Sequence, residues 1–304
     1  MVKPAVAIIE PVGGHGGMNY YDFGLASGVT HSGQQVVLYT SSETIVDSTY
    51  PFQIKTIFQG VWGRQPKVIR AFNFLWSLLK SLNDAKNNSV DIAHFHFFHY
   101  GLQERLTISL AKLFGFKVVI TAHDVESFHG QRDSEKAKAI LMKANAVIAH
   151  NFVSKKALIE KVELPDSLIY VIPHGNYIDL IRSSPQKSVA RQALGIDGDK
   201  VILFFGQIKK VKGLDCLLEA LPLVLKENPT AKLIIAGKLW KDDWEIYNQI
   251  IKKHQLAPSI IEHIHYIADE DVANYYCAAD IIALPYKEIY QSGVLLMAMS
   301  YQTP

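Results

Sequence analysis

The chain has 304 residues, of which 49% are hydrophobic and 20% charged, and its formal net charge at pH 7 is +2. This composition is typical of a soluble globular protein and excludes an intrinsically disordered one. The near-neutral balance of charge gives no general case for nucleic acid as a partner. The length is enough for two domains of about 150 residues each.

The two cysteines, Cys216 and Cys277, lie far apart in the sequence and lack metal-ligand spacing, which fits a reducing compartment. Both are expected in helices as small buried hydrophobic residues. The apolar run Ala5–Ile9 is too short for a signal peptide, and no run approaches the roughly 18 apolar residues of a membrane-spanning helix. We therefore expect a cytoplasmic protein.

Strand and helix patterns alternate along the first part of the chain. Strands are predicted at 6–9, 35–39, 54–58, 91–95, 117–121, 146–149 and 168–172, with helices at 18–30, 68–85, 102–114 and 135–144. The turn 173–176 and the polar stretch 183–187 then predict a linker.

After this linker the alternation restarts, which predicts a second domain. Strands are predicted at 200–205, 231–236, 263–266 and 280–284, with helices at 214–227, 243–255, 270–278 and from about Gln291. The apolar run 281–284 is typical of a parallel strand buried on both faces. Two such series predict an α/β protein with two parallel-sheet domains, residues 1–174 and 175–304. The expected ligand site is a cleft between them.

The last segment, residues 279–304, combines a strand, a loop that opens with Pro285, and a helix with Ser292 and Gly293 at its start. Free backbone N–H groups and the helix dipole make such a start an anion site. An ordinary strand–loop–helix connection that binds nothing has the same pattern, and the segment by itself leaves both interpretations open.

This segment resembles the nucleotide-sugar-binding part of family 4 glycosyltransferases, through its Leu-Pro-Tyr, Gln-Ser-Gly-Val-Leu and Ala-Met-Ser-Tyr-Gln-Thr-Pro strings. The resemblance implies the GT-B fold, in which two Rossmann-like domains face a cleft, and it implies donor binding at Ser292, Gly293 and Val294. Met297 stands where the family usually has a ribose-binding Glu, and Gln302 stands where it has Gly. Family members usually continue past the final Pro, so the second domain is expected to be incomplete.

A second segment, from Gly206 to Gly213, resembles the family's Gly-Arg-x-x-x-x-Lys-Gly pattern, whose basic residues neutralise the departing nucleoside diphosphate. Gly206 and Gln207 fall at donor-binding positions, with Gln207 in the place of the Arg. Lys212 is the first candidate for charge stabilisation and Lys209 the second. Without the resemblance, such a lysine cluster is usually a solvated loop.

The glycine-rich loop 13–17 follows the first predicted strand. It lacks the dinucleotide fingerprint, because Asn19 occupies the position of the last glycine. Its backbone amides suit a diphosphate, and a tight turn is the alternative. The resemblance assigns Gly16 and Gly17 to this donor-binding role.

Histidines are dense between residues 91 and 99, and His94 and His96 are expected on one face of a strand. No nearby carboxylate or cysteine completes a metal set, so cleft-lining or core histidines are favoured over a metal site. The string Thr-Ala-His-Asp resembles a family motif whose histidine contacts the donor sugar, which implies that role for His123. The alternative is that Asp124 merely satisfies His123.

Two further acidic features each have an alternative explanation. Glu288 precedes the last helix, where an acidic residue of the family approaches the donor sugar, and an exposed loop carboxylate is the alternative. Asp-x-Asp strings at 197–199 and 269–271 match the metal motif of the other glycosyltransferase fold. The first lies in a linker turn and the second fits helix capping, so neither is assigned a metal.

The helix predicted over 68–85 has two possible surroundings. A basic helix with aromatic residues is able to lie on an anionic membrane surface, which lipid-linked acceptors require. The favoured alternative is a core-facing helix with a solvated basic edge. The residues concerned are Arg64, Lys67, Arg70 and Lys80 with Val68, Ile69, Phe72, Phe74, Leu75, Trp76, Leu78 and Leu79.

Together these patterns predict a retaining glycosyltransferase of bacterial-type polysaccharide or glycolipid synthesis, with retention implied by the resemblance alone. It would move a sugar from a nucleoside-diphosphate sugar to a hydroxyl of a saccharide or lipid-linked acceptor, without cofactor, metal or nucleic acid. The proposed catalytic residues are His123, Lys212, Lys209 and Glu288. The alternatives are a nucleotide-sugar-binding protein with impaired transfer and, more weakly, a nicotinamide-dependent enzyme.

Overall fold

The computed structural model describes residues 4–14, 17–44, 46, 49–63, 65–123, 131–197, 200–288 and 291–304. The chain divides into two compact units, Met1–Gly175 (unit 1) and Asn176–Pro304 (unit 2). The boundary expected from the sequence, after residue 174, lies one residue earlier. The predicted cleft between the domains stays a prediction.

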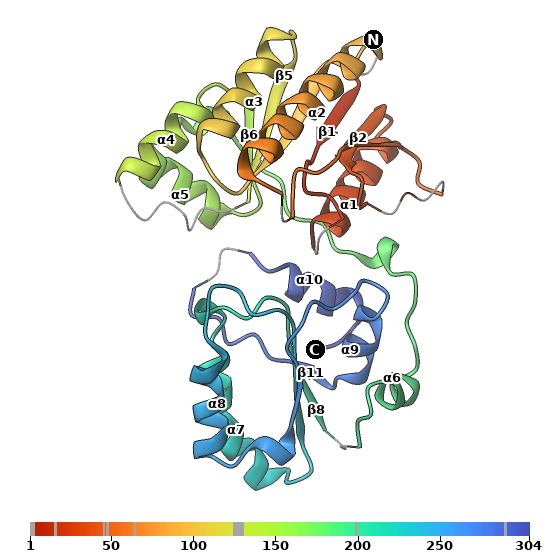
Figure 1. Cartoon of the computed structure of the whole chain (residues 1–304), viewed down its shortest axis with the longest axis vertical. Coiled ribbons are helices and arrows are strands. Elements are labelled where there is room, and N and C mark those ends of the chain that lie inside the picture. The colour runs from red at the N-terminus through yellow and green to blue at the C-terminus, as the bar shows by residue number, and fades with distance from the viewer. Residues whose placement is uncertain are drawn as a thin grey trace. The chain divides into compact units, whose positions relative to one another are not determined.

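Unit 1 is built on a parallel seven-stranded sheet in the order β3-β2-β1-β4-β5-β6-β7. The strands are β1 (Val6–Ile9), β2 (Val36–Ser41), β3 (Gln53–Phe58), β4 (Ile92–Phe97), β5 (Lys117–Ala122), β6 (Ala146–Ala149) and β7 (Ile169–Val171). Its helices are α1 (Gly17–His31), α2 (Lys67–Asn87), α3 (Leu102–Leu113), α4 (Gln131–Leu141) and α5 (Phe152–Val162), and they lie along the sheet in Figure 1. The strand order reverses between β1 and β4, as in doubly wound folds.

Unit 2 is built on a parallel four-stranded sheet in the order β10-β9-β8-β11. Its strands are β8 (Val201–Phe205), β9 (Lys232–Ala236), β10 (Ile260–His263) and β11 (Ile281–Ile282). Its helices are α6 (Lys187–Ala193), α7 (Leu214–Glu227), α8 (Trp244–Lys253), α9 (Val272–Ala278) and α10 (Gly293–Ser300), with α7 and α8 side by side (Figure 1). The apolar faces of α7 and α8 close the core over β8 and β9.

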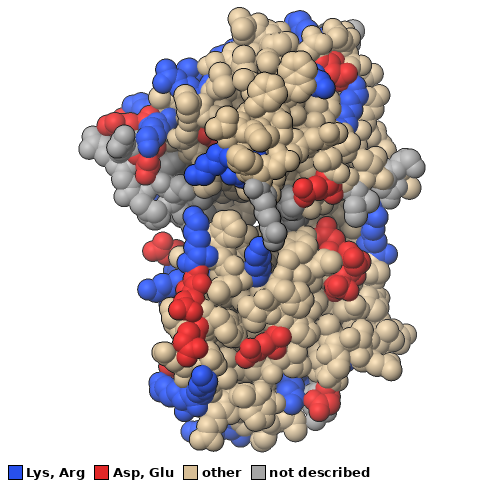
Figure 2. Space-filling model, viewed as in Figure 1, with Lys and Arg blue, Asp and Glu red and all other residues tan. Residues whose placement is uncertain are grey.

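The surface has no dominant sign of charge on the face drawn in Figure 2, where basic and acidic side chains are intermixed. This mixture matches the net charge of +2. None of the helices in the described part of the chain is both long enough and apolar enough to cross a membrane.

The strand predicted over 280–284 is shorter than expected, and the prediction that it is buried on both faces is wrong. Only Ile281 and Ile282 form β11, and Ile281 is 49% exposed. Among the described strands β11 pairs only with β8, at the edge of the sheet. Pairing extends one step further through the Ala283 amide, which donates to the Leu203 carbonyl at 2.8 Å. Pro285 then follows without an N–H to donate.

Other sequence expectations also need correction. Cys216 is exposed rather than buried, because the buried residues of α7 (Leu214, Leu218 and Leu221) occupy another face of that helix. The strand predicted at 263–266 lies three residues earlier, at 260–263. Asp271 occupies the N-cap position of α9 but makes no capping hydrogen bond through its side chain.

Two of the described α-helices were not predicted from the sequence. α5 begins after Asn151, whose side chain accepts a hydrogen bond from the Ser154 amide at 2.7 Å, a capping signal that the sequence did contain. α6 begins at Lys187, the last residue of the stretch 183–187 that was predicted as a linker, and no element was predicted between it and residue 200. Its seven residues are too few to be stable alone, so tertiary contacts hold it in place.

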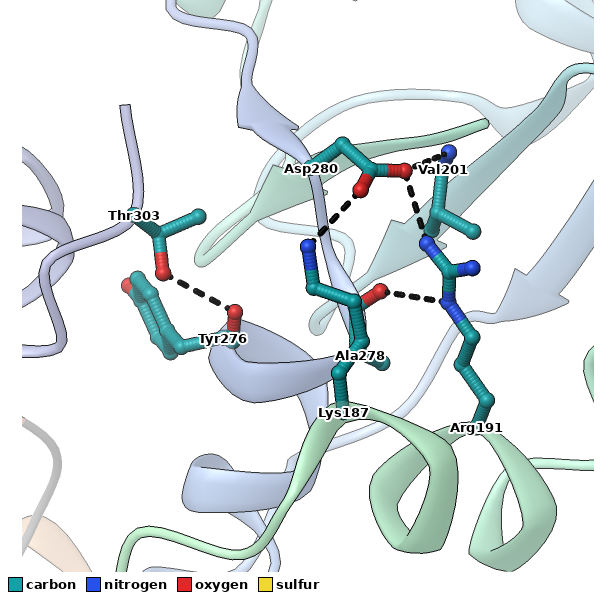
Figure 3. A network of polar contacts seen from close by, with 7 residues as sticks. All are labelled: Lys187, Arg191, Val201, Tyr276, Ala278, Asp280 and Thr303. Carbon is teal, nitrogen blue, oxygen red and sulfur yellow. Dashed lines mark hydrogen bonds and ion pairs between the residues drawn. The ribbon is translucent and has the colours of Figure 1, made fainter. Parts of the chain in front are cut away.

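The contacts that hold α6 converge on Asp280, just before β11 (Figure 3). Its carboxylate accepts hydrogen bonds from Lys187 Nζ at 2.8 Å, Arg191 Nη2 at 2.7 Å and the Val201 amide at 2.8 Å. Arg191 Nε also donates to the Ala278 carbonyl at 3.0 Å. The Asp280 carboxylate therefore ties α6 to the start of β8, and Arg191 ties α6 to the end of α9.

A second bond in Figure 3 anchors the end of unit 2. Thr303 is buried, and its hydroxyl donates to the Tyr276 carbonyl at 3.0 Å. The Ile282 amide donates to the Pro304 carbonyl at 2.6 Å. These bonds hold the segment after α10 against α9 and β11.

We expect the substitution Asp280→Ala to lower the free energy of unfolding by about 2 kcal/mol, because two cationic donors and one backbone amide lose their acceptor. Urea unfolding at pH 7, followed by circular dichroism, measures this change. The control is Asp197→Ala: the Asp197 side chain is 87% exposed and 3.5 Å from Lys232. Its loss should change stability by less than about 0.5 kcal/mol. Equal unfolding midpoints for the two variants would contradict the role given to Asp280.

Candidate functional site

Four neighbouring strands of unit 1 carry a histidine at or just beyond their carboxyl ends. His96 lies in β4, His123 follows β5, His150 follows β6, and His174 stands three residues after β7. Because the strands are parallel, these ends meet at one edge of the sheet. The four imidazoles therefore gather, although their positions in the sequence span nearly 80 residues.

The ring of Tyr21, from α1, lies at the centre of this histidine cluster. Its centroid is 5.1 Å from that of His96, 4.6 Å from His123, 5.4 Å from His150 and 4.8 Å from His174, all with edge-on geometry. Such edge-to-face pairs are favourable beyond the burial of their area. Tyr21 is buried and organises the cluster from the helix side.

Hydrogen bonds link the cluster to its surroundings. His96 Nδ1 is 3.0 Å from His123 Nε2, so the two rings share one proton. His94 Nε2 is 2.8 Å from the Thr121 hydroxyl, behind the cluster. His150 Nδ1 lies 2.9 Å from the Ile172 carbonyl, which can only accept, so this nitrogen carries the proton.

Burial keeps these imidazoles neutral. Burial and the neighbouring His150 lower the pKa of His94 to about 4. Burial and nearby imidazoles hold the pKa of His96 and of His123 well below the usual value. A neutral imidazole has one donor and one acceptor nitrogen, so the cluster offers hydrogen bonds without positive charge at pH 7.

Two buried carboxyl groups, Glu10 and Asp22, adjoin the cluster and were not predicted from the sequence. Burial raises the pKa of Glu10 to about 7, although the Val12 amide donates to its Oε1 at 2.9 Å. Burial, and then the charge of Glu10, raise the pKa of Asp22 well above its usual value. Asp22 Oδ1 and His96 Nε2 face each other across 3.6 Å, too far for a hydrogen bond, and neither has another partner among the described residues.

The expectation that His94 and His96 share one face of a strand is confirmed, since their rings stack at 4.9 Å. Within the described ranges, no three or more His, Cys, Asp or Glu side chains are placed to hold a metal ion. Asp124, the suggested partner of His123, lies outside the described residues.

In unit 2, the glycines after β8 and β9 allow backbone segments to pack very closely. Gly206 has φ 100°, and a Cβ there would lie 3.2 Å from Val294 Cγ2. A Cβ on Gly237, with φ 146°, would lie 1.8 Å from the Gly206 carbonyl oxygen. Two predicted donor-binding residues, Gly206 and Val294, are thus brought together from different ends of unit 2.

The loop after β8 also meets the start of α10 through side chains. Lys212 Nζ lies 3.9 Å from the centroid of the Tyr286 ring, a cation–π contact. The Tyr286 hydroxyl is 3.2 Å from Ser292 Oγ, which caps α10 by accepting from the Leu295 amide at 3.1 Å. Lys212 and Ser292 therefore share one edge of the unit 2 sheet, and both are half-buried.

The remaining predicted site residues of unit 2 are half-buried or exposed. Lys209 is half-buried and precedes the turn 210–212, and Gln207 is exposed. Gly293 is exposed, and a Cβ there would lie 3.3 Å from the Tyr177 hydroxyl. Glu288 is exposed in the loop before α10.

Two departures from the family pattern have different structural consequences. Met297 is buried, so its side chain belongs to the interior of unit 2. Gln302 has φ 56°, in the left-handed region. Glycine adopts that region without strain, which explains a glycine preference at this position.

The glycine-rich loop of unit 1 is described only in part. Gly16 lies outside the described residues, and Gly17 is the exposed first residue of α1. A Cβ on Gly13 would lie 1.7 Å from Thr40 Oγ1, and one on Gly14 would lie 2.7 Å from the Glu43 backbone. Packing against the segment around β2 therefore suffices to explain these two glycines.

Residues 15–179 match a family model described as Glycosyltransferase Family 4, and residues 199–304 match one described as Glycosyl transferases group 1. Spore coat protein SA of Bacillus subtilis is 33% identical over 94 residues, 30% of this chain and 25% of the relative. A D-inositol 3-phosphate glycosyltransferase of Kineococcus radiotolerans is 21% identical over 319 residues, 96% of this chain and 72% of the relative. The matches of this chain to two other relatives span 43% and 41% of their lengths.

Among solved structures, HepE of Anabaena in complex with UDP and glucose has a TM-score of 0.70 at 19% identity, covering 99% of this chain and 79% of that one. Starch synthase IV of Arabidopsis thaliana bound to ADP and acarbose has a TM-score of 0.71 at 13% identity, covering 99% of this chain and 82% of that one. The α/β fold with two parallel-sheet, Rossmann-like units, as in the GT-B fold, is confirmed.

The neutral histidines predict a loss of stability in acid. The unfolded chain binds protons at the ordinary histidine pKa of 6.5, whereas folded His94 does so only near 4. Stability is therefore complete above pH 6.5 and falls as the pH drops toward 4, by about 3 kcal/mol for this one group. Glu10 and Asp22, whose pKa values are raised, act in the opposite direction, but the histidines with a lowered pKa outnumber these two groups.

Urea unfolding of the wild type and of His94→Gln at pH 7.5 and pH 5 tests this. The variant should be less stable at pH 7.5, because the bond to Thr121 is lost, but it should lose less stability between the two pH values. His31→Gln, at an exposed site on α1, should keep the wild-type pH dependence. An unchanged slope in His94→Gln would contradict the assignment.

Proposed function

The chain belongs to glycosyltransferase family 4, and we propose that it transfers a sugar from a nucleoside-diphosphate sugar to an acceptor hydroxyl with retention at the anomeric carbon. The observation that carries the proposal is the meeting of two segments in unit 2. The loop with Lys212 and the start of α10 with Ser292 adjoin at the carboxyl ends of β8 and β11. The HepE structures with UDP and UDP-glucose support a nucleotide-sugar donor.

In the proposed reaction, the bond between the anomeric carbon and the diphosphate oxygen breaks, and its electron pair leaves with the diphosphate. The acceptor oxygen bonds to the same face of the anomeric carbon, and its proton passes to the departing phosphate. Negative charge thus grows on the diphosphate as it departs. Lys212, Lys209 and the amides of the α10 N-terminus would offset this charge without a metal.

The role proposed for His123 follows from its neutrality. Burial depresses its pKa, so the ring would bind the sugar through hydrogen bonds rather than as a cation. Its bond to His96 fixes the orientation of the ring. The donor would also contact the backbone at four positions, Gly206, Gln207, Gly293 and Val294. Glu288 would approach the sugar from its loop.

The wider context is proposed from the relatives. Several relatives named as glycosyltransferases are bacterial, and we propose a role in bacterial-type polysaccharide or glycolipid synthesis with a saccharide or lipid-linked acceptor. The exposed free thiol of Cys216 fits a reducing compartment, in line with a cytoplasmic protein.

A membrane contact is supported by one face of α2. Val68, Phe72, Trp76 and Lys80 follow one another at a spacing of four residues and are all exposed, while Phe74 and Leu78 are buried on another face. Lys80 Nζ lies 5.3 Å from the Trp76 ring. An exposed aromatic stripe with cations beside it suits an anionic membrane surface, which a lipid-linked acceptor would require.

The alternative function is donor binding with impaired transfer, and the burial of Met297 favours it, because an apolar side chain replaces the usual ribose-binding carboxylate. Under this alternative the protein would bind a nucleotide sugar without turning it over. Conversion of the donor, followed by NMR of the anomeric proton, separates the two functions and reports retention directly.

We expect calorimetric titration without metal to show binding of one of UDP, GDP and ADP. Lys212→Ala should weaken that binding by at least about tenfold, because a partly buried cation facing the diphosphate is lost. Lys210→Ala, at an exposed position in the same turn, should bind as the wild type does. The proposal is excluded if none of the three nucleotides binds, and the role of Lys212 is excluded if both variants behave alike.

The membrane contact predicts flotation of the protein with vesicles that contain phosphatidylglycerol, but not with neutral vesicles. Trp76→Ser should reduce the bound fraction by about tenfold, because one large apolar side chain no longer enters the interface. Leu223→Ser, which replaces a 65% exposed apolar residue on α7, should bind normally. Absence of the wild-type protein from the floated fraction would sink this proposal.

A further inference from the structure

Unit 1 contains a cavity of about 500 Å³ beside the ends of β1 and β4. We propose that it binds the acceptor and recognises an anionic group on it, a phosphate or a carboxylate, through Arg70 and Lys67. The identification of the ligand as the acceptor rests on the proposed function. The preference for an anion rests on the side chains of the cavity alone.

The cavity lies at the topological switch point of the sheet. Its walls come from the chain just after β1, from the end of β4 and the residues that follow it, and from the starts of α2 and α3. The strand order reverses between β1 and β4. Crevices at such reversals are where doubly wound sheets bind their ligands.

Arg70 is the feature that points to an anion. The Nε atom of Arg70 is buried and has no hydrogen-bond partner among the described residues. In the described part of the chain, no ion pair joins the Arg70 guanidinium to an acidic side chain. A guanidinium is always charged, and a desolvated donor without a partner is unfavourable. A bound carboxylate or phosphate would supply the missing acceptor, in the forked geometry that arginine favours.

The surroundings of Arg70 strengthen this preference. Lys67 lies three residues earlier, on the same side of α2, and also lines the cavity. α2 begins at Lys67, so the positive end of its dipole lies at the same wall. The two acidic residues of the lining are bonded elsewhere: Glu104 Oε2 accepts from the Gly101 amide at 2.8 Å, and Glu10 Oε1 accepts from the Val12 amide at 2.9 Å.

The rest of the lining suits a hydroxylated ring. Trp62 is 48% exposed and Phe98 is 39% exposed, so both offer aromatic faces at the cavity. Phe98 stacks on His123 with 4.8 Å between ring centroids. His96 also lines the cavity and bonds to His123. An acceptor held by its anion at Arg70 therefore extends toward the residue that would hold the donor sugar.

Calorimetric titration of the full chain with glucose 6-phosphate, glucuronate and glucose tests the inference. We expect at least one anionic sugar to bind tenfold or more tightly than glucose, and the stronger of the two identifies phosphate or carboxylate. Arg70→Gln should abolish this preference. Arg105→Gln, the same substitution at an exposed site on α3 outside the lining, should retain it.

Should Arg70→Gln fail to fold, Lys67→Gln is used in its place, because Lys67 is exposed. It should weaken the binding of the anionic sugar several-fold. Equal affinities for all three sugars, or a preference that survives both substitutions, would overturn the inference. UDP, GDP and ADP are titrated in parallel. If none of them binds while the anion preference persists and depends on Arg70, the proposed transfer fails and the anion site stands. If one of them binds but no anion preference is found, only the cavity assignment fails.

Discussion

Parallel pairing of the strands is the constraint on which the rest of this structure depends. In both units every described strand pairs in the parallel sense, so each chain segment that leaves a strand does so at the same edge of its sheet. In unit 1 this edge carries the histidine cluster and the cavity beside β1 and β4. In unit 2 the corresponding edge carries the loop with Lys212. Parallel pairing thus places the candidate functional residues at one edge of each sheet, while most buried strand residues are apolar.

The candidate site residues of the two units differ in charge. In unit 1 desolvation favours the neutral forms of buried groups, because it lowers the pKa of His96 and His123 and raises that of Glu10 and Asp22. In unit 2, the Lys212 side chain lies against the ring of Tyr286, whose hydroxyl contacts Ser292 at the start of α10. A neutral, hydrogen-bonding surface suits sugars, and a charged one suits a diphosphate. This difference supports the roles proposed for His123, which would bind the sugar, and for Lys212, which would stabilise the diphosphate.

Arg70 brings a permanent charge into the cavity of unit 1, and its Nε lacks a partner among the described residues. The same helix presents Phe72 and Trp76 to the outside. α2 therefore has two faces with different surroundings: one is buried and lines the cavity, since Phe74 and Leu78 belong to both, and the other is exposed. This arrangement explains why the amphipathic pattern of the sequence supported two interpretations at once.

The sequence by itself determined the alternation of strands and helices, the two-unit α/β fold and the local loops, because periodicity and glycine positions are short-range properties. It also marked Lys212, Ser292 and His123 through a pattern shared with a family. Only the tertiary structure decided that β11 is an edge strand with Ile281 exposed, that Cys216 faces outward, and that His150 and His174 join His96 around Tyr21. Burial, and with it the neutrality of the histidines and the unpartnered Nε of Arg70, depends on neighbours far apart in the chain. Spacing along a sequence carries no information about such neighbours.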